Sequence, residues 1–187
     1  MKGRYMSRTK SLKHQKVLVN PARCVGCRTC ELECSVAHSP SRDIYEMARA
    51  GERPGYRITI ESYDNQPIPV HCAHCENAAC QAACPTGAIY REEANGPVLF
   101  VAERCIGCRM CLHACPFGVI TLHPLGNGIM KCDQCIERLE QGRQPACTEG
   151  CPTGALIFGD EEDVAKAKRR QSAQRLVNSR AEDVLKG

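Results

Sequence analysis

Short apolar runs recur along this chain, and each lies next to a cysteine-rich turn. Runs of four or five residues rich in Val, Ile, Leu and Phe are typical of short β-strands when charged residues, Gly or Pro bound them. The predicted strands cover residues 16–19, 57–61, 98–101, 119–122 and 155–158. Together with the helical turns between them, these strands predict an α+β fold.

Two segments outside the strands predict helices. Residues 44–50 have an apolar helical pattern, which Gly51 and Pro54 then end, so this segment is expected to lie on the surface. The tail from Asp160 opens with acidic residues and then turns basic, an order that complements the helix macrodipole. A C-terminal helical tail over residues 160–187 is therefore predicted, packed on the body or extending from it.

Sixteen cysteines form four groups of four, and the sequences around them repeat. The groups are Cys24, Cys27, Cys30 and Cys34; Cys72, Cys75, Cys80 and Cys84; Cys105, Cys108, Cys111 and Cys115; and Cys132, Cys135, Cys147 and Cys151. Groups one and three are spaced C-x2-C-x2-C-x3-C, while groups two and four widen only the middle gap. The similar segments CPTGAI, CPFGVI and CPTGAL begin at the last cysteine of groups two, three and four, which indicates an internal repeat.

Cysteine at this density binds metal inside the cell or forms disulfides outside it. The first 20 residues are basic but contain no apolar stretch of roughly 7 to 15 residues, so no export signal is predicted. No apolar run approaches the ~20 residues of a membrane-spanning helix. We expect a cytoplasmic protein that reaches a membrane only peripherally, through a partner.

The spacing of the cysteines favours iron-sulfur clusters. A C-x2-C-x2-C-x3-C-P run gives three ligands to one 4Fe-4S cluster and its last cysteine to another. Gly26 and Gly107 lie inside these loops, where the absence of a Cβ lets backbone N–H groups approach cluster sulfurs. Structural zinc is the alternative, because four cysteines also suit a tetrahedral site, but zinc normally takes two separated pairs.

The histidines are expected to stay outside the ligand sets, because each group already contains four cysteines. His71 and His74 surround Cys72 and are interpreted as loop residues that tune a nearby cluster. We interpret His38, His113 and His123 in the same way. No Ser/His/Asp constellation, phosphate loop or carboxylate pair stands out, so the protein is predicted to carry electrons and not to be an enzyme.

Residues 1–15 form a predicted basic, mobile N-terminal tail. Such a tail suits an acidic partner, and would suit nucleic acid only if the sites held zinc. The formal net charge of +4 omits the metal. Four clusters of net charge about −2 each, thiolates included, would change it to roughly −4, so the formal charge is a poor guide to partners. No nucleic-acid partner is expected.

Taken together in this order, the four groups resemble the four-cluster ferredoxin-type subunits that serve molybdopterin oxidoreductases, formate dehydrogenases, hydrogenases and carbon monoxide dehydrogenases. The resemblance covers residues 17 to about 159. It implies two ferredoxin-like two-cluster units with nested connectivity. Groups one and four would form an outer unit of residues 16–64 and 125–159, and groups two and three an inner unit of residues 65–124.

The resemblance also implies which cysteines hold each of four 4Fe-4S clusters. Set I is Cys24, Cys27, Cys30 and Cys151; set II is Cys132, Cys135, Cys147 and Cys34; set III is Cys72, Cys75, Cys80 and Cys115; and set IV is Cys105, Cys108, Cys111 and Cys84. Some family members lack one cysteine of group three and carry a 3Fe cluster. All four are present here, so four complete clusters are expected.

Within the family, CRTCELECSVAHS (27–39) and PIPVHCAHC (67–75) are most similar to the iron-sulfur protein of carbon monoxide dehydrogenase. That protein passes electrons from CO oxidation toward a membrane-bound hydrogenase or another acceptor. The resemblance therefore implies a one-electron relay with these two partners. An equivalent subunit of a formate dehydrogenase, hydrogenase or molybdopterin oxidoreductase, a free ferredoxin, and a zinc-binding interaction module are the alternatives.

Overall fold

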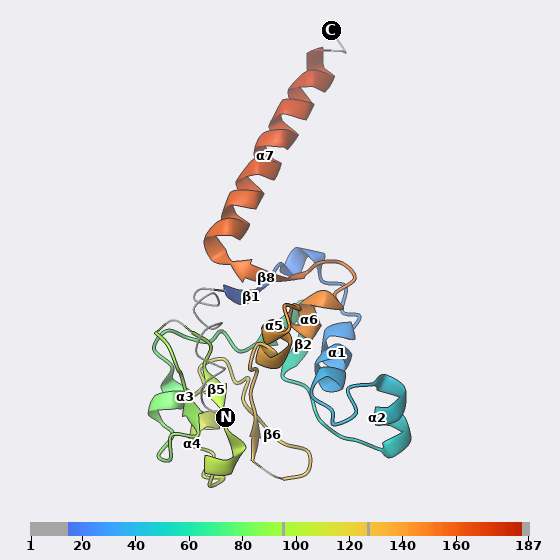
Figure 1. The fold of residues 1–187 in the computed structure, drawn as a ribbon. Helices are drawn as coiled ribbons and strands as arrows, with labels where there is room; N and C mark the ends of the chain where they lie inside the picture. Colours follow the sequence, from blue (N-terminus) through green and yellow to red (C-terminus); the bar gives the residue numbers. More distant parts are fainter. Residues whose placement is uncertain (1–14, 95, 127, 185–187) are drawn as a thin grey trace.

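The computed structural model describes residues 15–94, 96–126 and 128–184 (Figure 1). The predicted mobile tail therefore lies outside the described residues, apart from Gln15, which begins the first strand. Within these ranges the fold combines short helices with small sheets. The predicted α+β class is thereby confirmed.

The described strands pair into two-stranded antiparallel sheets. The pairs are β1 (Gln15–Val19) with β8 (Leu156–Asp160), β2 (Ile58–Tyr63) with β3 (Gln66–His71), β4 (Ile89–Tyr90) with β5 (Leu99–Phe100), and β6 (Thr121–Leu122) with β7 (Ile129–Met130). Three of these pairs join strands adjacent in sequence. The β1–β8 pair instead joins the two ends of the cysteine-bearing body, with Val17 opposite Phe158.

All five predicted strands are present, with ends shifted by up to two residues. The sequence did not predict β3, because Pro67 and Pro69 lie within it and proline cannot donate to a sheet ladder. In a two-stranded sheet each strand has an open edge, so β3 tolerates both prolines. The interpretation of His71 as a loop residue is wrong, since His71 ends β3 opposite Ile58.

The helices of the body are short. They are η2 (Pro21–Arg23), α1 (Thr29–Ala37), α2 (Ile44–Ala50), α3 (Ala79–Ala82), η3 (Ala102–Arg104), α4 (Met110–Ala114), α5 (Ile136–Glu140) and α6 (Ala146–Glu149). Helix α2 has the predicted bounds. The Asp43 carboxylate caps its start by accepting the N–H of Tyr45 and Glu46 at 2.9 and 3.0 Å, and left-handed Gly51 ends it.

The body contains two hydrophobic cores in which cysteine packs with aliphatic residues. The first core contains Val17, Cys30, Cys34, Ile58, Ile60, Cys147 and Leu156, and the second contains Ile89, Val98, Cys111, Ile120 and Ile129. The first therefore draws on both ends of the body and the second on its middle. Neither buries an aromatic side chain at its centre, so apolar burial alone gives little stability and metal ligation is needed to complete these cores.

The long helix α7 (Glu161–Val184) confirms the predicted C-terminal helix. It contacts β8 and β1 at its start and then extends away from the body (Figure 1). Its described side chains are mostly exposed beyond Ala165. Within the described ranges, no helix combines the length and the apolar composition that crossing a membrane requires.

Candidate metal centres

None of the sixteen cysteines, all of which lie in the described ranges, forms a disulfide, and all but Cys27 and Cys108 are at least partly buried. Groups one and three repeat in backbone conformation as well as in sequence. In each, a 3-10 helix leads to the first cysteine, the second cysteine lies between a left-handed glycine and a left-handed arginine, and the third cysteine lies in the α-helix that follows. The glycines are Gly26 and Gly107, with φ of 71° and 69°, and the arginines are Arg28 and Arg109.

The set I cysteines line one small cavity. Cys24, Cys27 and Cys30 come from the first loop, and Cys151 comes from the far end of the body. Pro69 and Leu156 are among the apolar walls. Although some burial opposes it, hydrogen bonds from the Leu156 backbone and the Thr153 hydroxyl hold the pKa of Cys151 below its ordinary value, which favours the thiolate that binds metal.

A second small cavity is lined by the set III cysteines. Cys72, Cys75 and Cys80 follow β3, while Cys115 follows α4 and belongs to the next cysteine group. The Sγ of Cys72 accepts the backbone N–H of His74 at 3.4 Å. Such N–H donors stabilise the negative charge of a ligating sulfur.

In the rest of the body, thiols of separate cysteine groups also lie near one another. Burial, followed by the thiols of Cys135, Cys34 and Cys30, raises the pKa of Cys147 well above its ordinary value. In set IV, burial is the main cause that raises the pKa of Cys111, to which Cys108 and Cys105 add. The fourth cysteine of this set, Cys84, packs against the same core as Cys111.

These donor sets fit iron-sulfur clusters. Crowded, buried thiols resist ionisation on their own, and a positively charged metal core removes that penalty, since ligating thiols must be deprotonated. An orphaned donor agrees with this. His74 is 4% exposed and its Nδ1 accepts the N–H of Val98 at 3.0 Å, so Nε2 carries the proton, yet Nε2 has no hydrogen-bond partner in the described part of the protein. A bound group with acceptor atoms would satisfy this N–H.

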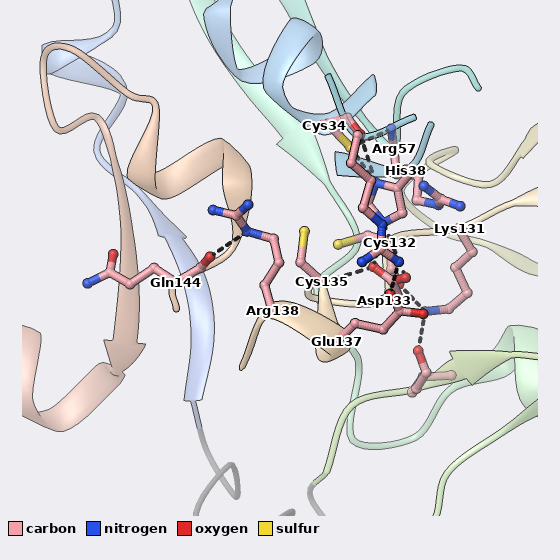
Figure 2. A network of polar contacts seen from close by, with 12 residues as sticks. Cys34, His38, Arg57, Lys131, Cys132, Asp133, Cys135, Glu137, Arg138 and Gln144 are labelled. Carbon is pink, nitrogen blue, oxygen red and sulfur yellow. Dashed lines mark hydrogen bonds and ion pairs between the residues drawn. The ribbon is translucent and has the colours of Figure 1, made fainter. Parts of the chain in front are cut away.

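His38 lies at the C-terminal end of α1, where it bridges two cysteine groups (Figure 2). Its Nδ1–H donates to the carbonyl oxygen of Cys34 at 2.7 Å, and its Nε2 lies 3.1 Å from Oδ1 of Asp133. Burial opposes protonation, but the hydrogen bonds to Asp133 and Cys34 raise the pKa of His38 to about 9. Both ring nitrogens therefore donate, which leaves no lone pair for a metal.

Several polar residues of these centres could not be predicted from the sequence. Asp133 accepts the backbone N–H of Cys135 at 2.9 Å as well as bonding His38. Glu31 and Lys131 are 7% and 3% exposed, although charged residues next to cysteines are normally expected at a solvated surface. Glu31 accepts the N–H of Ile60, 29 residues away in sequence, and Lys131 donates to the carbonyl of Val98, 33 residues away. Only the tertiary fold therefore reveals the burial of these two charges.

Residues 64–161 match the model of the 4Fe-4S dicluster domain, and residues 21–37 match that of the 4Fe-4S binding domain. The protein belongs to the 4Fe-4S dicluster domain family. Two matching 4Fe-4S domains and sixteen cysteines confirm the predicted cofactor, four 4Fe-4S clusters.

Three relatives are similar over most of the sequence. The "Iron-sulfur protein" of Rhodospirillum rubrum is 37% identical over 175 residues, which cover 87% of this protein and 91% of the relative. The thiosulfate reductase electron transfer subunit PhsB of Salmonella typhi is 37% identical, covering 88% and 86%. An anaerobic dimethyl sulfoxide reductase subunit of Escherichia coli is 35% identical, covering 79% and 74%. This similarity shows that the protein is an iron-sulfur electron-transfer protein and not a catalytic subunit.

Proposed function

We propose that each 4Fe-4S cluster is held by three cysteines of one group and the last cysteine of another, as sets I to IV. The observation that carries this proposal is the sharing of a cavity by cysteines distant in sequence, Cys151 with Cys24 in one case and Cys115 with Cys72 in the other. When bound, each cluster takes up and gives back one electron. The cysteines bind it, and the surrounding apolar residues exclude water.

We propose nested connectivity on the same grounds. Pairing of β1 with β8 and packing of α1 on α6 support an outer unit built from both ends of the body, and packing of α3 on α4 supports an inner unit. The division between residues 124 and 125 falls inside the β6–β7 hairpin, and Ile129 packs in the second core with Ile120. The inner unit therefore extends to β7.

We further propose that the catalytic partner is carbon monoxide dehydrogenase and that the acceptor is a hydrogenase complex. The support is the similarity of residues 27–39 and 67–75 to the iron-sulfur protein of that enzyme. The second candidate partner is a catalytic subunit like those of thiosulfate reductase or dimethyl sulfoxide reductase. The support is that two similar relatives are subunits of these two enzymes.

An electron-transfer assay separates these candidates. Adding the iron-loaded protein to carbon monoxide dehydrogenase under CO should increase the rate of acceptor reduction several-fold and saturably. The same protein stripped of iron is the control and should have no effect. An unchanged rate at saturating iron-loaded protein would reject this partner. The second candidate would then be tested with a thiosulfate or dimethyl sulfoxide reductase, a chemical reductant as electron donor and the substrate of that reductase as the final acceptor.

A further inference from the structure

Lys131 is a buried cation in the middle of the body. It follows β7 directly, and its side chain is among the most buried of the described residues, with 3% exposure. Its Nζ donates to the carbonyl oxygens of Val98 at 2.5 Å and of Cys132 at 3.0 Å (Figure 2). Val98, which is 1% exposed, comes from the inner part of the sequence, so Lys131 ties two distant segments together.

No carboxylate compensates this charge in the described part of the protein. The ion pairs found there involve other cations, and the neighbouring Asp133 is engaged by His38 and by the N–H of Cys135. Two carbonyl dipoles satisfy hydrogen bonds but supply no net negative charge. Burying a cation without an anion is strongly unfavourable, so a negative group other than a carboxylate is needed near Lys131.

The groups nearest to Lys131 include cysteines of two ligand sets. The backbone carbonyl that it bonds belongs to Cys132 of set II. Val98, whose carbonyl oxygen Lys131 also bonds, lines the cavity of the set III cysteines, so Lys131 lies beside set III as well. A 4Fe-4S cluster with its four thiolates has a net charge of about −2, so each of these sets, once loaded, supplies the missing negative charge.

We propose that Lys131 is the buried counter-charge of the clusters at sets II and III and that it raises their reduction potentials. The inference rests on the ligand sets proposed above. Reduction makes a cluster more negative by one unit, and a fixed cation in a low-dielectric interior stabilises the reduced form more than the oxidised form. Lys131 acts as a positioning and potential-setting residue, since it binds no iron.

The test is an anaerobic redox titration of the iron-loaded full-length protein, followed by electron paramagnetic resonance. Lys131→Met and Lys131→Gln remove the charge at similar length, and Lys131→Arg keeps it. We expect two of the four potentials to fall in both uncharged variants by at least about 59 mV, a tenfold change in a one-electron equilibrium, and to stay unchanged with Arg. Lys166→Met is the matched control, because Lys166 is exposed on α7, and should shift no potential.

Iron content separates this proposal from the proposed function. If the unaltered protein holds markedly less than about 16 Fe, the ligand sets fail. If Lys131→Met holds full iron with all four potentials unchanged, the counter-charge proposal alone is overturned. Should the Met and Gln variants not load iron while Arg does, charge is required for assembly, which supports the proposal. If Arg also fails to load iron, Lys131 serves only packing and the proposal is wrong.

Discussion

His38 and Asp133 lie 95 residues apart in sequence and form a partly buried ion pair, with Nε2 3.1 Å from Oδ1. Each also holds a proposed ligand segment, because His38 donates to the Cys34 carbonyl and Asp133 accepts the Cys135 N–H. The pair therefore fastens α1 to the segment after β7. It positions two cysteines of set II that the sequence alone leaves far apart.

Asp133→Ala should destabilise the protein by about 1–3 kcal/mol, because it leaves a buried imidazolium and a backbone N–H without their acceptor. The measurement is the urea midpoint for loss of cluster absorbance. His38→Ala should lower the free energy of unfolding by a similar amount, and the double variant should lower it by less than the sum of the two single changes. Glu46→Gln, which breaks the exposed Arg49–Glu46 pair on α2, is the control and should change stability by less than about 0.5 kcal/mol. Additive losses in the double variant would contradict the coupling.

Anaerobically prepared protein should contain about 16 Fe and about 16 acid-labile sulfides per molecule, since four complete sets are present. Iron chelation should remove not only the visible absorbance but also much of the folded structure, because core residues such as Cys30, Cys34, Cys147 and Cys111 would lose their metal. Elemental analysis measures the iron content, and circular dichroism before and after chelation measures the loss of folded structure. A reproducible iron content near half the expected value would reject four clusters, and zinc in place of iron would reject the cofactor.

The cysteine chemistry was predictable from the sequence because ligand spacing is a local property. The same holds for α2, whose cap residues Asp43 and Gly51 flank it directly, and for α7. Strand β3 was missed because two prolines argue against a strand unless its open edge is known. The strands β4 and β7 were missed because, unlike β5 and β6, neither lies within a run of four strand-forming residues such as 98–101 or 119–122.

The buried charges were not predictable, for a different reason. Glu31 and Lys131, which are 7% and 3% exposed, each lie beside a cysteine, where a sequence gives no sign of burial. Their burial follows from tertiary partners, such as the Ile60 N–H that Glu31 accepts and the Val98 carbonyl that Lys131 bonds. A charged side chain is normally exposed, so composition predicts the wrong environment for both.

Glu31→Gln should raise the potential of one cluster, opposite in sign to the change expected for Lys131. Glu31 is 7% exposed on α1 next to Cys30, and its Oε1 accepts the Ile60 N–H at 2.6 Å. Glutamine keeps that acceptor and loses the negative charge. In the unaltered protein, the exposed Arg28 guanidinium 3.2 Å away compensates this charge only in part, so the charge disfavours reduction of a cluster at set I. The same redox titration should show a single potential rise by about 59 mV or more. Glu46→Gln, exposed on α2, is the matched control, and an equal shift there would show that local charge is not the cause.

The sharing of ligands between groups can be tested with two double variants. Cys24 and Cys151 line one cavity, so replacing both by Ala should remove one cluster and leave about 12 Fe, because each change falls on the same site. Cys24 and Cys34 are close in sequence, yet in the proposed sets they serve different clusters. Their double replacement should damage two sites and leave about 8 Fe.

The single variants are the controls for this comparison, since one missing ligand can be replaced by solvent or leave a 3Fe cluster. Unchanged spectra of the set III and set IV clusters in both double variants would show that the inner fold is intact. If Cys24→Ala/Cys34→Ala retained more iron than Cys24→Ala/Cys151→Ala, each group would be holding its own cluster. The cavity that joins Cys24 to Cys151 would then be a packing feature of the first core, and the nested connectivity would have to be abandoned with it.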